Sequence, residues 1–120
     1  MSQKMDGLRP QTKLVRAGLS RSQFNETSEA LYLNSGFVFD DAAQAEAAFK
    51  GENDSYIYSR YGNPTVSVFE ERLAMLEGAE MCRATATGMA AVFASIACHV
   101  RAGERVVASR ALFGSCHFIL

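Results

Sequence analysis

Residues 87–98 contain no charged side chain, and this stretch constrains the fold more than any other in the sequence. Apolar residues recur through it and just beyond it at the spacing of one helix face, namely Met89, Val92, Phe93, Ile96, Ala97 and Val100. We predict a helix over about residues 88–100, stopped by Gly103. A helix without charged residues is buried on most of its sides, so it must pack against other layers of structure.

Short extended segments are predicted on both sides of this helix. Residues 81–86 are mostly small or apolar, and residues 105–109 read Arg-Val-Val-Ala-Ser, which has β-branched character. A strand, a helix and a strand in this order form a βαβ unit, whose strands are parallel with a right-handed crossover. The turns at residues 87–89 and 111–114 then lie at the carboxyl edge of the sheet, where open α/β sheets bind ligands. The predicted fold class is therefore α/β.

The composition excludes several classes of function. With 48% hydrophobic and 21% charged residues, the chain is typical of a globular protein. Its net charge is −1 and its 12 basic residues are dispersed, so we expect no nucleic-acid partner and no membrane partner. Cys82, Cys98 and Cys116 form no CxxC pair, and His99 and His117 each follow a cysteine, which predicts neither disulfides nor a metal site. With no signal peptide in view, we expect a cytoplasmic protein.

The N-terminal part is predicted to be an arm followed by a short helix. Residues 1 to about 35 show no sustained period and at most a short turn near residues 12–18. Such an arm is expected to lie across another subunit or a larger body. The helix has its usual signals, namely an N-cap at Asp40 or Asp41, an alanine-rich body over residues 42–50, and Gly51 at the C′ position.

A second helix is predicted to follow Asn63. Asn63 caps it, Pro64 occupies its first position and Gly78 ends it. Its apolar face is predicted to contain Val66, Phe69, Leu73 and Leu76. The opposite, solvent-facing side is predicted to carry Glu70, Glu71 and Arg72.

The loop before this helix is the best candidate for a ligand site. Residues 56–65 contain three tyrosines, one arginine and a Gly-Asn-Pro turn. Arginine offers a planar fork of donors that suits a phosphate or a carboxylate, and tyrosine adds hydroxyl donors. The alternative is an aromatic loop that packs on a neighbouring surface while its arginine is only solvated.

A second candidate anion site lies at the start of the uncharged helix. There the backbone N–H groups and the helix dipole favour an anion, and Gly88 allows a ligand to approach the main chain closely. The alternative is that Gly88 only permits tight packing between strand and helix. Phe113 follows the second predicted strand, and its ring either stacks on a flat heterocycle or belongs to the core.

Three motifs in this order resemble the N-terminal part of the Cys/Met-metabolism family of pyridoxal-phosphate enzymes. They are Tyr-Ser-Arg-Tyr-Gly-Asn-Pro-Thr at residues 58–65, Thr-Gly-Met-Ala-Ala at residues 87–91 and Leu-Phe-Gly-Ser at residues 112–115. The resemblance covers nearly the whole chain and implies fold type I, the aspartate-aminotransferase-like fold. It implies an arm and short helix with inter-subunit contacts over residues 1–55, and the beginning of the large, cofactor-binding domain over residues 56–120.

The resemblance also implies the roles of five site residues. Tyr58 and Arg60 are expected to bind the cofactor phosphate of the neighbouring subunit, so that active sites are shared in a homodimer or homotetramer. The N–H groups of Gly88 and Met89 are expected to bind the phosphate of their own subunit. Phe113 stands where many members of the family carry a tyrosine that stacks on the pyridine ring.

With phenylalanine in that unit, the chain looks most like the O-succinylhomoserine sulfhydrylases. The implied reaction is γ-replacement, in which sulfide displaces succinate from O-succinyl-L-homoserine to give L-homocysteine. The alternatives are a cystathionine γ-synthase, a methionine or cystathionine γ-lyase, and a non-catalytic product that keeps the oligomerisation surface. Lys4, Lys13 and Lys50 lack the context of the family's Schiff-base lysine. We therefore expect no catalytic residue in this segment and interpret it as the front portion of a longer enzyme.

Overall fold

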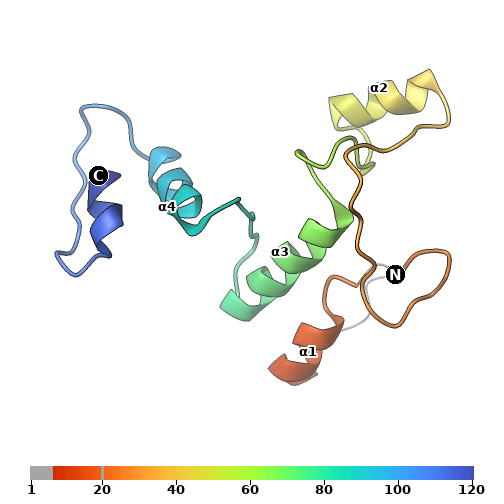
Figure 1. Cartoon of the computed structure of the whole chain (residues 1–120), viewed down its shortest axis with the longest axis horizontal. Coiled ribbons are helices and arrows are strands. Elements are labelled where there is room, and N and C mark those ends of the chain that lie inside the picture. The colour runs from red at the N-terminus through yellow and green to blue at the C-terminus, as the bar shows by residue number, and fades with distance from the viewer. Residues whose placement is uncertain (1–6, 20) are drawn as a thin grey trace. The chain divides into compact units, whose positions relative to one another are not determined.

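The computed structural model describes residues 7–19 and 21–120 (Figure 1). These residues form four α-helices and one 3-10 helix, and they contain a single isolated β-bridge between Gly36 and Tyr58. They belong to two compact units, Met1–Cys82 and Arg83–Leu120, which we describe separately. No helix in the described part of the chain is long and apolar enough to cross a membrane.

The first unit begins with helix α1, Pro10–Arg16. The sequence predicted no more than a short turn here, but Pro10 at the first helical position favours a helix of seven residues. The helix ends at Ala17, and Gly18 then adopts a left-handed conformation with φ of 67°. A Cβ atom on Gly18 would lie 3.1 Å from the backbone of Val68, so glycine allows the arm to lie directly on helix α3.

Helix α2, Ala42–Lys50, has the predicted bounds. Asp41 is its N-cap, and its carboxylate accepts the N–H of Gln44 at 2.7 Å. The Gln44 side chain in turn accepts the backbone N–H of Asp40. Gly51 ends the helix in the left-handed conformation with φ of 72°, as expected for a glycine at this position.

Helix α3, Pro64–Glu77, also has the predicted caps, with Asn63 before it and Gly78 after it in the left-handed conformation. Its predicted faces were wrong. Val66, Phe69 and Leu76 of the expected apolar face are 40%, 54% and 53% exposed. The arm instead contacts Thr65, Val68 and Arg72, which recur at i, i+3 and i+7 and so share one face of the helix.

The second unit contains helix α4, Gly88–Ala97, and the 3-10 helix η1, Gly114–Phe118, which packs against it. Thr87 caps α4 by accepting the N–H of Ala90 at 3.1 Å. The helix ends near Cys98, a little earlier than predicted, because the N–H groups of both His99 and Val100 turn back to the carbonyl of Ile96.

The predicted strands are not formed in the described residues. Residues 81–85 and 104–109 are extended or irregular, and no ladder of hydrogen bonds joins them. A β-strand exists only where a neighbouring strand takes up its N–H and C=O groups, and these two segments do not serve each other as partners. In place of the predicted βαβ unit, the described residues form helix α4 between two extended segments.

The expected burial of α4 is also wrong for this chain. Among the described residues only Ala17 and Ala48 are buried hydrophobics and only Asn63 is a buried polar residue. No residue of α4 is buried, and Phe93 is 58% exposed. The apolar face that the sequence predicts is present, but the described residues cover it only in part, through η1 and the residues that follow it.

Candidate functional site

The loop that follows the β-bridge is a tight turn with Arg60 near its apex. The carbonyl of Tyr58 accepts the backbone N–H of Tyr61 at 2.8 Å and that of Gly62 at 3.1 Å. Gly36 pairs with Tyr58 in the antiparallel bridge, which joins the turn to the preceding arm. The turn therefore presents the side chains of Tyr58 and Arg60 from one short segment.

The guanidinium group of Arg60 lies against two tyrosine rings. Its Cζ atom is 5.5 Å from the ring centroid of Tyr58 and 4.7 Å from that of Tyr61. The two rings meet edge to face at 6.5 Å. Arg60 is exposed, and no carboxylate in residues 7–19 or 21–120 pairs with it. Cation–π contacts orient the guanidinium while its N–H donors still face solvent, an arrangement that suits an incoming anion.

The contact of Tyr61 with Arg60 was not predicted from the sequence. Tyr61 was recognised only as one of three phenols in the loop, yet it makes the shorter of the two cation–π contacts with Arg60. Its position directly after the arginine was the one available signal.

A second arginine, Arg72, fastens the arm to helix α3. Its guanidinium donates to both carboxylate oxygens of Glu29, at 2.7 and 3.0 Å, and to the carbonyl of Ala17 at 3.1 Å. The sequence placed Arg72 on the solvent side, which was wrong. Its contacts lie far away along the chain, so only the spacing from Thr65 and Val68 could have indicated its face.

This ion pair shifts the ionisation of both partners. Hydrogen bonds from Arg72 lower the pKa of Glu29 from 4.5 to about 2. The same hydrogen bonds raise the pKa of Arg72. The bidentate geometry is the strong form of this interaction, because the planar fork of arginine matches the two oxygens of a carboxylate.

In the second unit, the N-terminus of α4 has two unused backbone donors. The first four N–H groups of a helix have no partner within it. Thr87 accepts the N–H of Ala90, so those of Gly88 and Met89 are left to point out from the end of the helix. A Cβ atom on Gly88 would meet nothing within 4 Å. Packing within the described chain therefore gives no reason for a glycine at this position.

Phe113 directly precedes η1 and is 72% exposed. Its carbonyl accepts the N–H of Cys116 at 2.8 Å, which starts the 3-10 turn. The ring is therefore outside any core formed by the described residues.

The predicted site residues thus form two groups, one in each unit. Tyr58 and Arg60 share the turn of the first unit, while Gly88 and Met89 share the end of α4 in the second. No cluster of three or more metal-binding side chains occurs in the part of the chain that the structure describes.

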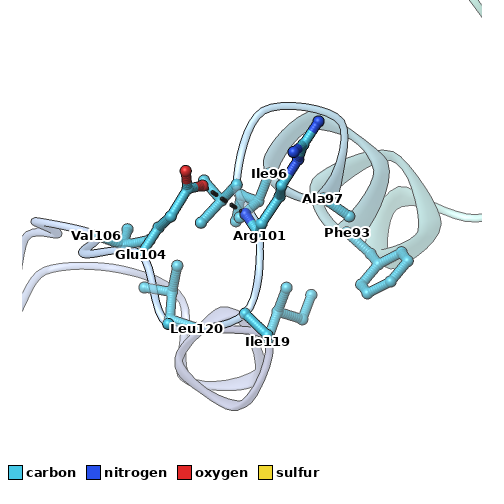
Figure 2. A pocket seen from close by; sticks show the side chains of 11 residues that line it. Phe93, Ile96, Ala97, Arg101, Glu104, Val106, Ile119 and Leu120 are labelled. Carbon is cyan, nitrogen blue, oxygen red and sulfur yellow. Dashed lines mark hydrogen bonds between the residues drawn. The ribbon is translucent and has the colours of Figure 1, made fainter.

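A hollow in the second unit is a different feature from the N-terminus of α4. It has a volume of about 280 Å³ and lies at the C-terminal end of α4, where the backbone N–H of Arg101 donates to Glu104 (Figure 2). Phe93, Ile96, Ile119 and Leu120 line it. Gly88 is roughly 14 Å away along the helix, given a rise of 1.5 Å per residue. None of the candidate site residues lines this hollow.

Comparison with known proteins identifies the family. Residues 11–120 match the Cys/Met metabolism PLP-dependent enzyme family. The chain belongs to this family. Pyridoxal phosphate is therefore its cofactor, as predicted, and the expectation of an enzyme is confirmed at the level of the family.

Three relatives from this family illustrate its range. The chain is 59% identical over 114 residues to the O-succinylhomoserine sulfhydrylase of Mycobacterium tuberculosis, covering 95% of this chain and 28% of that enzyme. It is 48% identical to the enzyme of the same name from Pseudomonas aeruginosa, with 92% and 28% covered. It is 40% identical to the L-methionine gamma-lyase of Porphyromonas gingivalis, with 89% and 27% covered. The chain therefore spans less than a third of the length of these relatives.

A solved structure supports the fold. A crystal structure from Campylobacter jejuni, described as an O-acetylhomoserine (thiol)-lyase, matches 93% of this chain and 28% of its own with a TM-score of 0.87 and 28% identity. It contains N'-pyridoxyl-lysine-5'-monophosphate. The predicted fold type I, an α/β fold, is thus confirmed, although residues 7–19 and 21–120 form only helices, extended segments and one β-bridge of it.

Two observations on the described residues fit the phosphate of this cofactor. One is the pair of N–H groups at Gly88 and Met89, together with the open space at Gly88. The other is the Arg60 guanidinium, which has oriented donors and no carboxylate partner among the described residues. Phosphate oxygens accept hydrogen bonds well from both kinds of donor.

Proposed function

We propose that this chain forms the front part of an enzyme that replaces the succinyl group of O-succinyl-L-homoserine by sulfide, yielding L-homocysteine and succinate. The observation that carries this proposal is the 59% identity with the O-succinylhomoserine sulfhydrylase of Mycobacterium tuberculosis over 95% of the chain. Identity with the methionine gamma-lyases is lower, at 40% and 39%. The proposal also predicts a role in methionine biosynthesis in the cytoplasm.

In this proposal the described residues hold the cofactor. Tyr58 and Arg60 donate to the phosphate in the neighbouring subunit, and the N–H groups of Gly88 and Met89 donate to it in their own subunit. The active enzyme is accordingly a homodimer or a homotetramer of dimers. The cofactor, when bound, accepts the electron pair that is left when a bond at the amino-acid substrate breaks.

Phe113 limits how protons are transferred in this enzyme. Its ring covers one face of the cofactor but carries no hydroxyl group, so it neither donates nor accepts a proton. The proposal assigns proton transfer to the Schiff-base lysine, located beyond residue 120. Phe113 would then exclude water and keep the cofactor in its orientation.

The proposal is tested with the purified full-length protein loaded with pyridoxal phosphate. It is supplied with O-succinyl-L-homoserine with and without sulfide, and homocysteine, succinate and 2-oxobutanoate are measured. We expect homocysteine and succinate in equal amounts when sulfide is present. 2-Oxobutanoate as the main product with sulfide present would contradict γ-replacement.

Three alternatives have distinct outcomes when the same protein is also supplied with L-methionine or L-cysteine. The γ-lyase alternative, which the gamma-lyase relatives favour, predicts release of methanethiol from L-methionine. A cystathionine γ-synthase would use L-cysteine in place of sulfide. A non-catalytic product would give no turnover and no visible absorption from bound cofactor.

A further inference from the structure

Asn63 is the only buried polar residue among those that the structure describes, with 6% of its surface exposed. Its side chain is fully used. The amide oxygen accepts the N–H of Thr65 at 2.9 Å, which caps α3. The amide nitrogen donates at 3.0 Å to the carbonyl of Tyr32 and at 3.0 Å to the hydroxyl of Ser59. These three bonds also establish which side of the amide carries the nitrogen.

A helix cap alone does not require this side chain. Aspartate, serine and threonine cap helices about as well as asparagine, because a cap needs only an oxygen acceptor. Asparagine is special in offering one acceptor and two donors from one short side chain. Here both donors are directed to residues outside the helix, one to the arm and one to the turn.

Ser59 links this amide to the candidate phosphate site. It lies between Tyr58 and Arg60, and its backbone N–H donates to the carbonyl of Ser35 at 2.9 Å. Its hydroxyl accepts from Asn63 and donates to the carbonyl of Asn34. The residue between the two proposed phosphate ligands is thus fixed by three hydrogen bonds to three different residues.

The arm completes the network from the other side. The backbone N–H of Tyr32 donates to the Thr65 hydroxyl at 2.8 Å, while its carbonyl accepts from Asn63. The arm at Tyr32, the turn at Ser59 and the start of α3 are therefore joined through one buried amide. Loss of its donors would remove one hydrogen bond to the arm and one to the turn while leaving the helix capped.

We propose that Asn63 is a positioning residue for Tyr58 and Arg60, acting through Ser59 to hold the turn in the conformation that receives a phosphate group. This inference rests on the proposed function, because it takes these two residues as phosphate ligands. It predicts that the amide donors of Asn63 contribute to cofactor affinity without contacting the cofactor.

The test uses Asn63→Asp in the full-length protein. Aspartate keeps the acceptor for Thr65 but places an oxygen against the carbonyl of Tyr32. We measure the dissociation constant of pyridoxal phosphate by titrating the cofactor-free protein, and its thermal unfolding. We expect affinity to fall roughly 10-fold, in the range for a disrupted buried hydrogen bond. Asp41→Ala, which removes the cap of α2 away from the turn, should leave affinity unchanged.

A double-variant cycle with Arg60→Ala separates positioning from general destabilisation. If Asn63 acts through the turn, Asn63→Asp should weaken cofactor binding less in the Arg60→Ala background than in the unchanged protein, because only Tyr58 is then left to be positioned. If the two single variants' losses of cofactor affinity multiply in the double variant, the two residues act independently, and the inference is overturned. If Asn63→Asp binds pyridoxal phosphate normally while Arg60→Ala binds it more weakly, the inference is also overturned. The proposed function is unaffected by that result.

Two further results complete the test. An unchanged affinity in Arg60→Ala itself would overturn the proposed phosphate role, and the inference with it. Should Asn63→Asp fail to fold, Ser59→Ala replaces it in the cycle, because this variant keeps the cap of α3 intact. We expect Ser59→Ala to weaken the cofactor about threefold, as for one neutral hydrogen bond, and no weakening would count against the inference.

Discussion

Arg60 is the single side chain on which the candidate phosphate site depends most. Arg60→Ala in the full-length protein should weaken cofactor binding by ~1.5–3 kcal/mol, the usual contribution of a hydrogen bond to a charged group. Arg60→Lys should recover part of the loss, because lysine keeps the charge but not the planar fork. A titration of the cofactor-free protein measures both. Arg9→Ala, at an exposed arginine in the arm, is the matched control, and equal losses in both variants would contradict a specific role.

Glu29 makes the attachment of the arm sensitive to acid. Its pKa in the folded chain is about 2 against a usual 4.5, so the folded state binds this proton less readily than the unfolded state. The contribution of the ion pair to stability is complete above about pH 4.5 and decreases as the pH falls toward 2. Glu29→Gln should remove this part of the pH dependence. Unfolding curves of the unchanged protein and of Glu29→Gln, recorded between about pH 7 and pH 2, measure this difference. If both proteins lose stability in parallel as the pH falls, the pH dependence does not come from Glu29.

At the scale of elements, a substitution at the N-terminus of α4 should change cofactor affinity without lowering the stability of the fold. Gly88→Ala adds a Cβ atom that meets nothing within 4 Å, and the backbone there is not left-handed. We expect the free energy of unfolding to be unchanged or raised by up to about 0.5–1 kcal/mol, because alanine loses less conformational entropy than glycine. Cofactor affinity should nevertheless fall, because the added methyl group would obstruct a phosphate at this helix end. Chemical unfolding and cofactor titration of the same variant measure both, and unchanged affinity would argue against close approach at Gly88.

The caps of α2 and α3 and the start of α4 could be predicted from the sequence, but the face of α3 could not. Asp41, Asn63, Thr87, Gly51 and Gly78 cap helices as predicted or at the predicted places, since capping depends on residues within a few positions. The face of α3 that contacts the arm depends on partners far away in sequence. The predicted apolar stripe is exposed, while a stripe of one hydroxyl, one valine and one arginine is covered instead.

For the candidate site, residue chemistry and motif order led us to predict the loop and the end of α4, but not the residues that support the loop. Arg60 was recognised because guanidinium and phenol groups suit an anion. Asn63 was recognised only as a cap, because its two donors contact residues 31 and 4 positions away. Whether a side chain has such second contacts is a property of the folded arrangement, which local patterns do not contain.

At the scale of the whole molecule, the same distinction explains the missing sheet. Residues 81–86 and 105–109 have the composition of strands, but a strand forms only when another backbone lies beside it. Among the described residues the only isolated β-bridge joins Gly36 and Tyr58, so neither segment is part of a sheet. The predicted α/β class rested correctly on the order of elements and the family motifs, while the sheet itself requires contacts that the described chain does not provide.

The 120-residue chain expressed alone should therefore fold poorly. Only two hydrophobic residues of its described part are buried, and the uncharged helix α4 exposes Phe93. Exposed apolar faces promote association between chains. We expect this chain alone to be poorly soluble, or to retain helical far-ultraviolet signal without a cooperative thermal transition. The full-length protein is the control and should unfold cooperatively. A monomeric 120-residue chain with a sharp thermal transition would contradict this prediction, because it would mean that these helices form a sufficient core by themselves.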